Sequence, residues 1–350
     1  MTAATALISG NEPLPQLVER AVSEALDGLN GEHANGVLLF LTPEFTRQAA
    51  SVVLSAARAA RCMQVFGSIC AGVCTEAGWV LDRPGVAAMA LGGNITLSGL
   101  ENGRNAEILC CTSNPFPSEW QNSHRYGLHF HGTAGDSAVW QQGRPNELGC
   151  VETHIAGARL DLLLSNGTHD LGQLQMVTDI RGYDLLTLDG MPAADALTPL
   201  LPADWQARQP LPIHLINAII PATAAAPAEI ASVLSVNADR SITLSSSLQP
   251  GQRLTWAVRQ PLSAEAEMCA TLGELGPIAP DFGLFFSCIG RGPYFYGGED
   301  RDLAAITERF PEMPLIGGYG TGQIAFSRNH SRQLQNAVVT ALFTETHDAV

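Results

Sequence analysis

Two stretches of the sequence, GVLLF to MQVFGSICAGV at residues 36–73 and GLFFSCIGRG to MPLIGGYGTGQI at residues 283–324, have the same layout. In each, a short apolar run ends at polar or small residues, a helical stretch follows, and a second apolar run enters a Gly-x4-Gly turn. A crossover of this length makes the two flanking strands parallel. We therefore expect an internal βαβ repeat whose turns, 67–72 and 317–322, frame a shared cavity outside the carboxyl ends of the strands.

The rest of the chain predicts two lobes. Apolar residues recur at helical spacing from Leu14 to Leu26, which indicates an N-terminal helix within residues 1–35. Short apolar runs separated by Gly, Asn and Asp are typical of strands over 79–180. Pro-rich stretches at 202–212 and 221–228 indicate the boundary between the two lobes. The predicted class is α/β to α+β, with two lobes that each hold a mixed β-sheet with flanking helices and are related by the βαβ pseudo-repeat.

Composition and charge exclude several function classes. The 350 residues are 46% hydrophobic and 15% charged, which is typical of globular domains. No apolar run approaches the roughly 18 residues that span a bilayer, and the N-terminus lacks a positively charged segment, so we expect a cytoplasmic protein without a membrane partner. A formal charge of −15 repels nucleic acid.

The 19 basic residues are all arginine. Without a lysine, the chain cannot be a Schiff-base aldolase, a pyridoxal enzyme, a P-loop nucleotide hydrolase or a protein kinase. The eight cysteines form no CxxC pair, which argues against a zinc ribbon, a thioredoxin site or covalent haem attachment. We expect most of them to be buried thiols in a reducing compartment.

Three segments together resemble the FIST family: FSCIGRG at 286–292, PLIGGYGTGQIA at 314–325 and LLTLDGMPAADAL at 185–197. The resemblance implies a FIST N-terminal domain over 36–205 and a FIST C-terminal domain over 206–350. It also implies an intracellular sensory protein that binds a small molecule, such as an amino acid or another carboxylate. A subset of the family resembles haem-dependent nitric oxide sensors. Where family members carry an acidic residue after each glycine turn, this chain has Val73 and Gln323.

The predicted ligand site collects side chains from the strand ends of both copies. Arg291 lies between two glycines and offers a guanidinium fork to a carboxylate; alternatively it pairs with a structural carboxylate such as Glu299 or Asp300. The other candidate ligand-binding residues are Thr42, Ser68, Cys70, Ser287, Cys288, Gly290, Tyr319, Gly320 and Thr321.

His129 and His131 are the candidates for a haem or metal site. Two apart in a strand-like segment, they would project from the same face, although no third ligand of clear spacing follows. Haem needs only one or two axial ligands in an apolar pocket, so it remains an alternative cofactor. His124, His154, His169 and His214 are further options.

Three functions are therefore open. The first is a non-enzymatic small-ligand sensor. No kinase, cyclase or DNA-binding pattern occurs in the chain, so such a sensor would act through a signalling protein partner. The second is a haem-based nitric oxide sensor. The third is a hydrolase or transferase that uses Cys288, whose thiolate Arg291 would stabilise, although no catalytic signature surrounds it.

Overall fold

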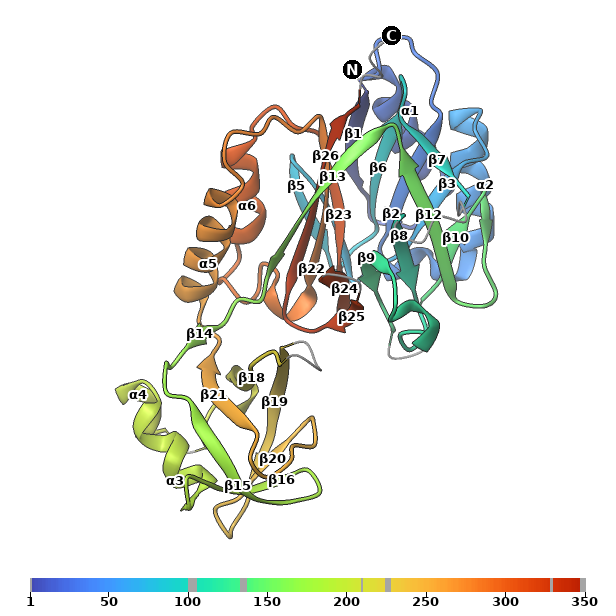
Figure 1. Cartoon of the computed structure of the whole chain (residues 1–350). Helices are drawn as coiled ribbons and strands as arrows, with labels where there is room; N and C mark the ends of the chain where they lie inside the picture. Colours follow the sequence, from blue (N-terminus) through green and yellow to red (C-terminus); the bar gives the residue numbers. More distant parts are fainter. Residues whose placement is uncertain are drawn as a thin grey trace. The chain divides into compact units, whose positions relative to one another are not determined.

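The computed structural model describes residues 2–99, 106–132, 137–208, 210–223, 228–327 and 330–346. The chain divides into two compact units: residues 1–166 together with 268–350 form unit 1, and residues 167–267 form unit 2 (Figure 1). Unit 2 is thus inserted into unit 1. The described part of the chain contains several mixed sheets and few helices, which confirms the predicted α+β fold with two lobes.

The described strands of unit 1 form three six-stranded sheets. The first sheet has the order β1 (Ala3–Ser9), β6 (Gly85–Leu91), β2 (Gly36–Leu41), β3 (Val65–Ile69), β10 (Val139–Gln141) and β11 (Arg144–Pro145). The second has β7 (Thr96–Ser98), β12 (Cys150–Ala156), β8 (Glu107–Thr112), β9 (His124–His129), β24 (Gly322–Ser327) and β25 (His330–Leu334). The third has β13 (Ala158–Ser165), β26 (Val338–Glu345), β22 (Phe282–Cys288), β23 (Leu315–Gly320), β4 (Gly72–Thr75) and β5 (Gly78–Leu81).

In these orders, all three sheets have the same sequence of pairings. The third and fourth strands are parallel (β2 with β3, β8 with β9, β22 with β23), and every other neighbouring pair is antiparallel. The hairpin that follows each fourth strand joins a different sheet. Hairpin β4–β5 follows β3 but pairs with β23, β10–β11 follows β9 but pairs with β3, and β24–β25 follows β23 but pairs with β9. The hairpins therefore exchange among the three sheets.

A glycine occupies the same register position in each parallel pair. A Cβ atom at Gly67, Gly127 or Gly317 would lie 1.8, 1.9 or 1.7 Å from the carbonyl oxygen of the residue paired with it on the neighbouring strand. Such distances are impossible for real atoms, so only glycine fits. This explains the first glycine of both Gly-x4-Gly turns.

A common core fills the space between the inner faces of the three sheets. Alternation along β2 places Leu38 and Phe40 in this core and turns Val37 and Leu39 to the outer face. Phe286 of the third sheet has the same register position as Phe40, and their rings meet edge to face with centroids 5.8 Å apart. The three sheets are therefore bound together by one apolar interior.

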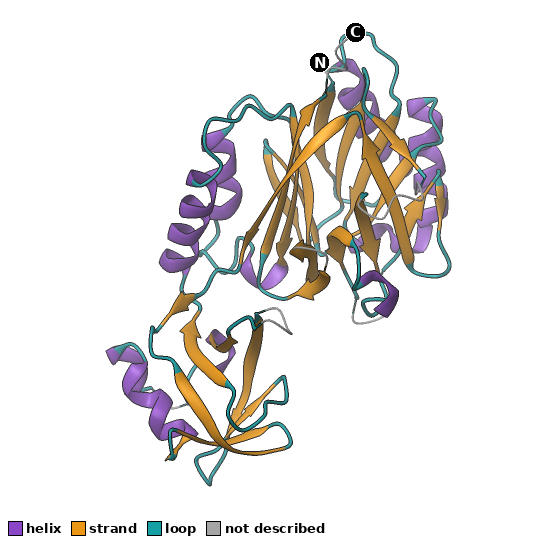
Figure 2. Ribbon diagram, in the orientation of Figure 1, coloured by secondary structure: helices purple, strands orange, loops and turns teal. Residues whose placement is uncertain are grey.

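Helices cover the outer faces of the sheets (Figure 2). Helix α1 (Pro15–Asp27) and helix α2 (Ala49–Ala60), which follows the 3₁₀ turn η1 (Pro43–Gln48), pack on the first sheet. The short turn η2 (Ser118–Trp120) packs on the second. The end of α5 (Pro261–Gly273) and α6 (Arg301–Arg309), which follows η5 (Ile289–Arg291), pack on the third. The predicted N-terminal helix is confirmed, whereas strand β1 before it was missed.

Both predicted strand-helix-strand units are present, and both strand pairs are parallel as expected. Because both copies lie in unit 1, they do not relate the two units to each other. A common origin of the two copies stays a prediction. The compact units end at residues 166 and 267, and the Pro-rich stretches lie inside unit 2. The predicted boundaries at 35 and 205 describe family domains and also stay predictions.

Unit 2 is a closed antiparallel barrel. Its strands are β15 (Gln175–Arg181), β16 (Asp184–Leu188), β20 (Ile242–Leu244), β19 (Glu229–Val236), β18 (Ile216–Ile220) and β21 (Arg253–Val258), and β18 pairs with β21 to close the ring. The short strands β14 (His169–Asp170) and β17 (Met191–Pro192) lie at its margins, with α3 (Ala193–Leu197), η3 (Thr198–Leu200), α4 (Ala203–Gln206) and η4 (Ile213–Leu215). Closure leaves fewer open strand edges, which limits pairing with other chains.

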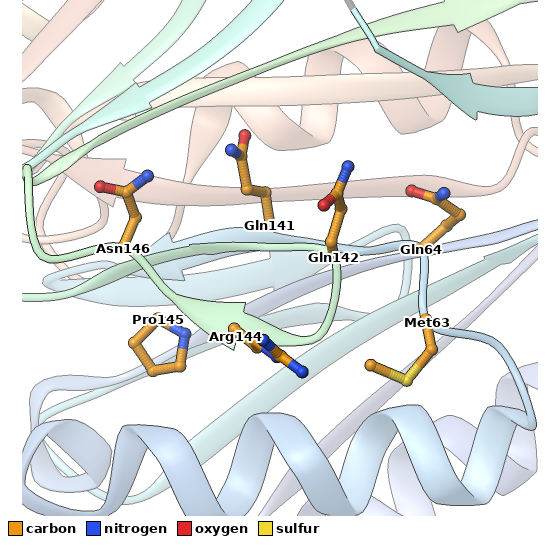
Figure 3. Close-up of a pocket in the computed structure, with 7 residues that line it drawn as sticks. All are labelled: Met63, Gln64, Gln141, Gln142, Arg144, Pro145 and Asn146. Atoms are coloured by element: carbon orange, nitrogen blue, oxygen red, sulfur yellow. The ribbon is translucent and has the colours of Figure 1, made fainter.

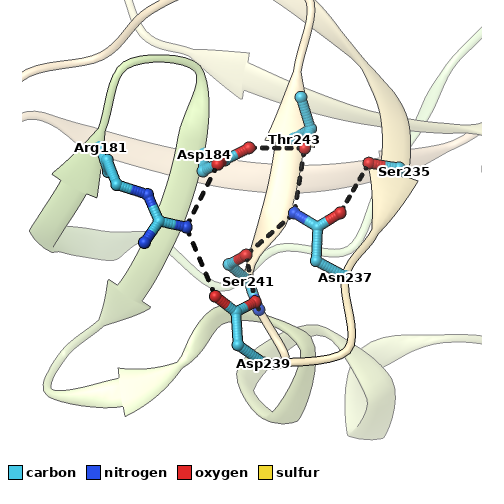
Figure 4. Close-up of polar contacts among 7 residues, drawn as sticks. All are labelled: Arg181, Asp184, Ser235, Asn237, Asp239, Ser241 and Thr243. Carbon is cyan, nitrogen blue, oxygen red and sulfur yellow. Dashed lines mark hydrogen bonds and ion pairs between the residues drawn. The ribbon is translucent and has the colours of Figure 1, made fainter.

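A network of polar side chains ties the β19–β20 turn of unit 2 to the β15–β16 turn (Figure 4). The amide of Asn237 donates to the hydroxyls of Ser241 and Thr243 at 2.9 and 3.1 Å, and its oxygen accepts from Ser235 at 3.0 Å. Thr243 in turn donates to Asp184 at 2.6 Å. The network satisfies its own members, which indicates a structural role.

We expect Asn237→Ala to lower the free energy of unfolding of unit 2 by about 1–2 kcal/mol, because three hydrogen bonds of a half-buried amide are lost. Amide hydrogen exchange in β19 and β20 would measure the change. The control is Arg181→Gln, which removes only ion pairs of an exposed side chain and should cost less than about 0.5 kcal/mol. Equal effects of the two variants would contradict the role assigned to the amide.

Candidate functional site

Arg291, a candidate ligand-binding residue from the sequence, follows the carboxyl end of β22, and its side chain is fully buried. It forms an internal ion pair, called the clamp below. Its Nε donates to Oδ2 of Asp302 at 2.9 Å and its Nη2 to Oδ1 at 2.8 Å. It also donates to the carbonyl and the hydroxyl oxygen of Ser165, at 3.0 and 2.6 Å. Burial alone would lower the pKa of Arg291, but the charge of Asp302 and the hydroxyl of Tyr296 outweigh it. These contacts match the structural alternative for Arg291, with Asp302 as the carboxylate.

A second buried carboxylate, Asp300, lies beside the clamp. It is the N-cap of α6, where it accepts from the backbone N–H of Leu303 at 3.0 Å, and the hydroxyl of Tyr319 donates to it at 2.5 Å. Burial raises the pKa of Asp300 to about 6, and the nearby charge of Asp302 adds to the rise, while the bond from Tyr319 opposes it. Two predicted ligand residues, Arg291 and Tyr319, thus contact internal carboxylates.

The two glycine turns lie side by side, as expected. The backbone N–H of Ala71 donates to the carbonyl oxygen of Tyr319 at 2.7 Å, and β4 continues from there as a direct neighbour of β23. A Cβ at Gly318 would lie 2.7 Å from the sulfur of Cys70. Ser68, Cys70, Ser287 and Tyr319 are all buried at this junction. Binding of a ligand between the turns stays a prediction.

The structure also brings His129, His131 and Thr321 together. Nδ1 of His129 lies 3.3 Å from the hydroxyl of Thr321 and 3.1 Å from Nε2 of Gln333. The backbone N–H of His131 donates to the same hydroxyl at 3.1 Å. Burial, helped by His131, lowers the pKa of His129. The described residues contain no group of three or more His, Cys, Asp or Glu placed to hold a metal ion. The haem hypothesis for these imidazoles stays untested.

The remaining candidates lie at strand ends. The hydroxyl of Thr42 is buried and accepts from the backbone N–H of Gly85 at 2.9 Å. The sulfur of Cys288 donates to the side-chain oxygen of Asn336 at 3.7 Å. Gly290 is exposed, and a Cβ at Gly320 would lie 2.5 Å from the carbonyl oxygen of His129.

Four other thiols are unsuited to nucleophilic catalysis. Burial raises the pKa of Cys111 to about 12, and it also raises the pKa values of Cys70, Cys74 and Cys110 well above the ordinary value of a thiol. A thiol with a raised pKa is protonated at neutral pH, whereas the thiolate is the reactive form. A role for Cys288 in catalysis stays untested.

An open pocket with a volume of about 870 Å³ lies at the edge of the first sheet where β1 and β2 end and β6 begins. The lining comes from three segments: Gly10, Asn11 and Pro13 after β1, residues 43, 44 and 46–48 of η1, and residues 82–84 before β6. This edge is the carboxyl end of β2, adjoining the predicted residue Thr42. The pocket therefore lies where the sheet topology leads us to expect a ligand.

Two arginines of this pocket, Arg47 and Arg83, were not among the sequence candidates. Their guanidinium groups have no hydrogen bond or ion pair with any residue that the structure describes. Two carboxylates, Glu44 and Asp82, line the same pocket, so its charged side chains balance. The available signal was weak: each arginine lies within a few residues of a proline that follows a strand. Two unpaired guanidinium groups in one hollow can bind a carboxylate.

A second open pocket, of about 610 Å³, surrounds the β10–β11 hairpin (Figure 3). Figure 3 shows the amides of Gln64, Gln141, Gln142 and Asn146 on one side of the hairpin, with the guanidinium of Arg144 pointing to the other side. The charged group and the amides therefore do not converge. This pocket also lies near the start of β3, away from the carboxyl ends of the parallel strands. The pocket at Arg47 and Arg83 is the better candidate.

Residues 193–326 match the family model of the FIST C domain. The match begins in unit 2 and continues into unit 1, where it includes the SCIGRG segment and the second glycine turn. It supports the resemblance to the FIST family and suggests a sensory domain in signal transduction. The paired N-terminal domain is outside the match and stays a prediction.

Two curated proteins of Mycobacterium tuberculosis are similar to this chain: the uncharacterized protein Rv0628c of strain ATCC 25618 / H37Rv and the uncharacterized protein MT0656 of strain CDC 1551 / Oshkosh. Each is 23% identical over 221 residues, which cover 60% of this chain and 58% of the relative. The chain thus spans less than two thirds of the length of these relatives. Among the described residues, no helix is both long and apolar enough to cross a membrane.

Proposed function

We propose that this protein is a non-enzymatic, cytoplasmic sensor of the FIST type, which binds a small carboxylate such as an amino acid and acts through a signalling protein partner. The observation that carries the proposal is a pair of guanidinium groups, Arg47 and Arg83, in one pocket at the carboxyl ends of β1 and β2, neither of which pairs with a residue in the described part of the chain. The match to the FIST C domain supports the sensory role.

Arg47 and Arg83 are informative because they share one pocket, since an exposed arginine outside it such as Arg58 also has no partner among the described residues. With 34 acidic and 19 basic residues, an arginine has many carboxylates with which to pair. Arginines 125, 159 and 240, for example, each form an ion pair with an acidic side chain. Arg47 and Arg83 instead line the pocket, and neither guanidinium has a hydrogen bond or ion pair with a residue that the structure describes. A ligand carboxylate would complete them with charge-assisted hydrogen bonds.

The other lining residues limit which chemical groups the ligand can carry. Pro13, Pro43 and Pro84 add rigid apolar surface to the pocket, which suits a hydrocarbon side chain. Glu44 and Asp82 would repel a ligand that carries only negative charge, but they can accept hydrogen bonds from an ammonium or hydroxyl group. A carboxylate with a neighbouring donor and an apolar side chain therefore fits best.

Calorimetric titration with L-phenylalanine, phenyllactate and 3-phenylpropionate tests the proposal. The three compounds share a carbon skeleton and a carboxylate, and they differ only in an amino group, a hydroxyl group or hydrogen at the next carbon. We expect at least one of them to bind, and Arg83→Gln and Arg47→Gln each to weaken binding about tenfold or more, because a charge-assisted bond is lost.

The matched control is Arg58→Gln. Arg58 lies exposed on α2 outside this pocket, and its guanidinium has no partner among the described residues, so the variant makes the same change in net charge. Binding should be unchanged in this variant. If Arg58→Gln weakens binding as much as the pocket variants, the effect is one of overall charge. If wild-type protein binds none of the three compounds, the proposed ligand class is wrong. A Soret band in protein purified from haem-replete cells would instead favour the haem sensor.

A further inference from the structure

The segment between Arg291 and Asp300 contacts a residue of the candidate pocket, Asp82, through one side chain, Tyr294. Both ends of the segment are fixed in the interior, Arg291 by its ion pair and Asp300 as the N-cap of α6. Between them, backbone hydrogen bonds from residues 295–298 back to residues 292–294 fold the chain into successive turns. The segment is therefore a compact structure from which Tyr294 projects.

Tyr294 is 63% exposed, yet its hydroxyl is not left to water. It donates a hydrogen bond to the carboxylate of Asp82, which lines the pocket beside Arg83. This bond raises the pKa of the Tyr294 phenol. The ring otherwise has no polar contact with the residues that the structure describes. An exposed ring buries little apolar surface and so adds little to stability. The hydrogen bond to Asp82 is therefore the main interaction that holds the Tyr294 side chain in this position.

We propose that Tyr294 is a specificity-determining residue of the pocket: its hydroxyl holds the place on Asp82 that a hydrogen-bond donor of the ligand takes. This inference rests on the proposed function. A ligand whose carboxylate binds Arg83 places the group on its next carbon near the adjacent residue, Asp82. An ammonium or hydroxyl group there replaces the phenol, whereas a methylene group cannot. A ligand donor that takes the position of the phenol on Oδ2 of Asp82 thus binds there only by releasing Tyr294.

Release of Tyr294 has a route into the rest of the fold. The next tyrosine, Tyr296, donates to Oδ2 of Asp302 at 2.8 Å, so the same segment contacts the buried ion pair at the start of α6. Gly297 and Gly298 follow with φ values of +84° and +119°, where a side chain would be strained, and both have open space around them. Occupancy of the pocket can therefore change the conformation of the exposed part of this segment, Tyr294 and residues 297–299, where a partner protein could detect it.

Tyr294→Phe, titrated with the same three compounds, tests the inference. The variant keeps the ring and removes only the hydroxyl, and the exposed position makes it a mild change for the fold. We expect it to bind L-phenylalanine and phenyllactate about three- to tenfold more tightly than wild type, because the ligand no longer has to displace a hydrogen bond. Affinity for 3-phenylpropionate, which brings no donor, should stay within about twofold.

The outcomes separate the inference from the proposed function. If all three compounds bind and Tyr294→Phe changes none of the affinities, or changes all three alike, the inference is overturned while the carboxylate pocket stands. If none binds to wild type, both fall. Without any ligand, absorbance titration of tyrosinate gives a second readout. Asp82→Asn should lower the pKa of one tyrosine relative to wild type and should have no such effect in the Tyr294→Phe background.

Discussion

Asp302→Asn should lower the free energy of unfolding of unit 1 by about 3–5 kcal/mol, because it leaves the guanidinium of Arg291 buried without a counter-charge. Both side chains of this pair are essentially inaccessible to water, with 1% and 0% of their surface exposed. Tyr296 also loses the charged oxygen to which it donates. Urea unfolding, with unit 1 followed by amide exchange in β22 and β26, would measure the loss.

Two controls define the meaning of that result. Glu24→Gln breaks an ion pair on α1 whose side chains are about half exposed, and it should cost less than about 1 kcal/mol. The double variant Arg291→Met with Asp302→Leu removes both charges and should recover most of the lost stability. If Asp302→Asn costs as little stability as Glu24→Gln, water reaches the ion pair of Arg291 and Asp302. A ligand could then also reach Arg291.

The second large effect concerns pH. The pKa of Asp300 is about 6 in the folded chain and about 3.9 in an unfolded chain. The folded state therefore binds this proton more tightly, so the stabilisation is complete below pH 4 and is lost as the pH rises through 6. Asp300→Asn keeps an N-cap oxygen but cannot ionise. From pH 4 to pH 7, wild type should lose about 2 kcal/mol of unfolding free energy relative to the variant.

Tyr319→Phe provides the control for this titration. The hydrogen bond from Tyr319 lowers the pKa of Asp300, so its removal should move the loss of stability to higher pH. The measurement is urea unfolding of wild type and both variants in steps from pH 4 to pH 8. A stability difference between wild type and Asp300→Asn that does not depend on pH would show that Asp300 has an ordinary pKa in the folded protein.

The two βαβ units could be predicted because their signals are local. A buried parallel strand reads as a continuous apolar run, and the crossover helix between the runs sets their direction. The third parallel pair, β8 with β9, was missed because only the short turn η2 and irregular chain connect its strands. The exchange of hairpins was also beyond prediction, since nothing in a short alternating segment such as GVCT at 72–75 identifies the sheet that it joins.

The candidate site shows the same division. The flanking glycines made Arg291 a ligand candidate from the sequence. In the structure its side chain is fully buried, and its guanidinium pairs with Asp302 instead of facing a ligand pocket. Arg47 and Arg83 carry no motif, and 35 residues lie between them in the chain. They meet because β6 returns antiparallel to β2, which places the turn before β6 beside the end of β2. That pairing is a property of the sheet and cannot be read from either arginine.

The exchanged hairpins have a consequence for how unit 1 can assemble. In every sheet, the last two strands are a hairpin that follows the fourth strand of another sheet. The segment that supplies the first four strands of a sheet therefore cannot complete that sheet alone. The many contacts distant in sequence slow folding. The first sheet has all of its strands once β11 has been made, whereas the second and third sheets stay incomplete until β25 and β26 follow. Until then, the unpaired strand edges of those two sheets are open to aggregation.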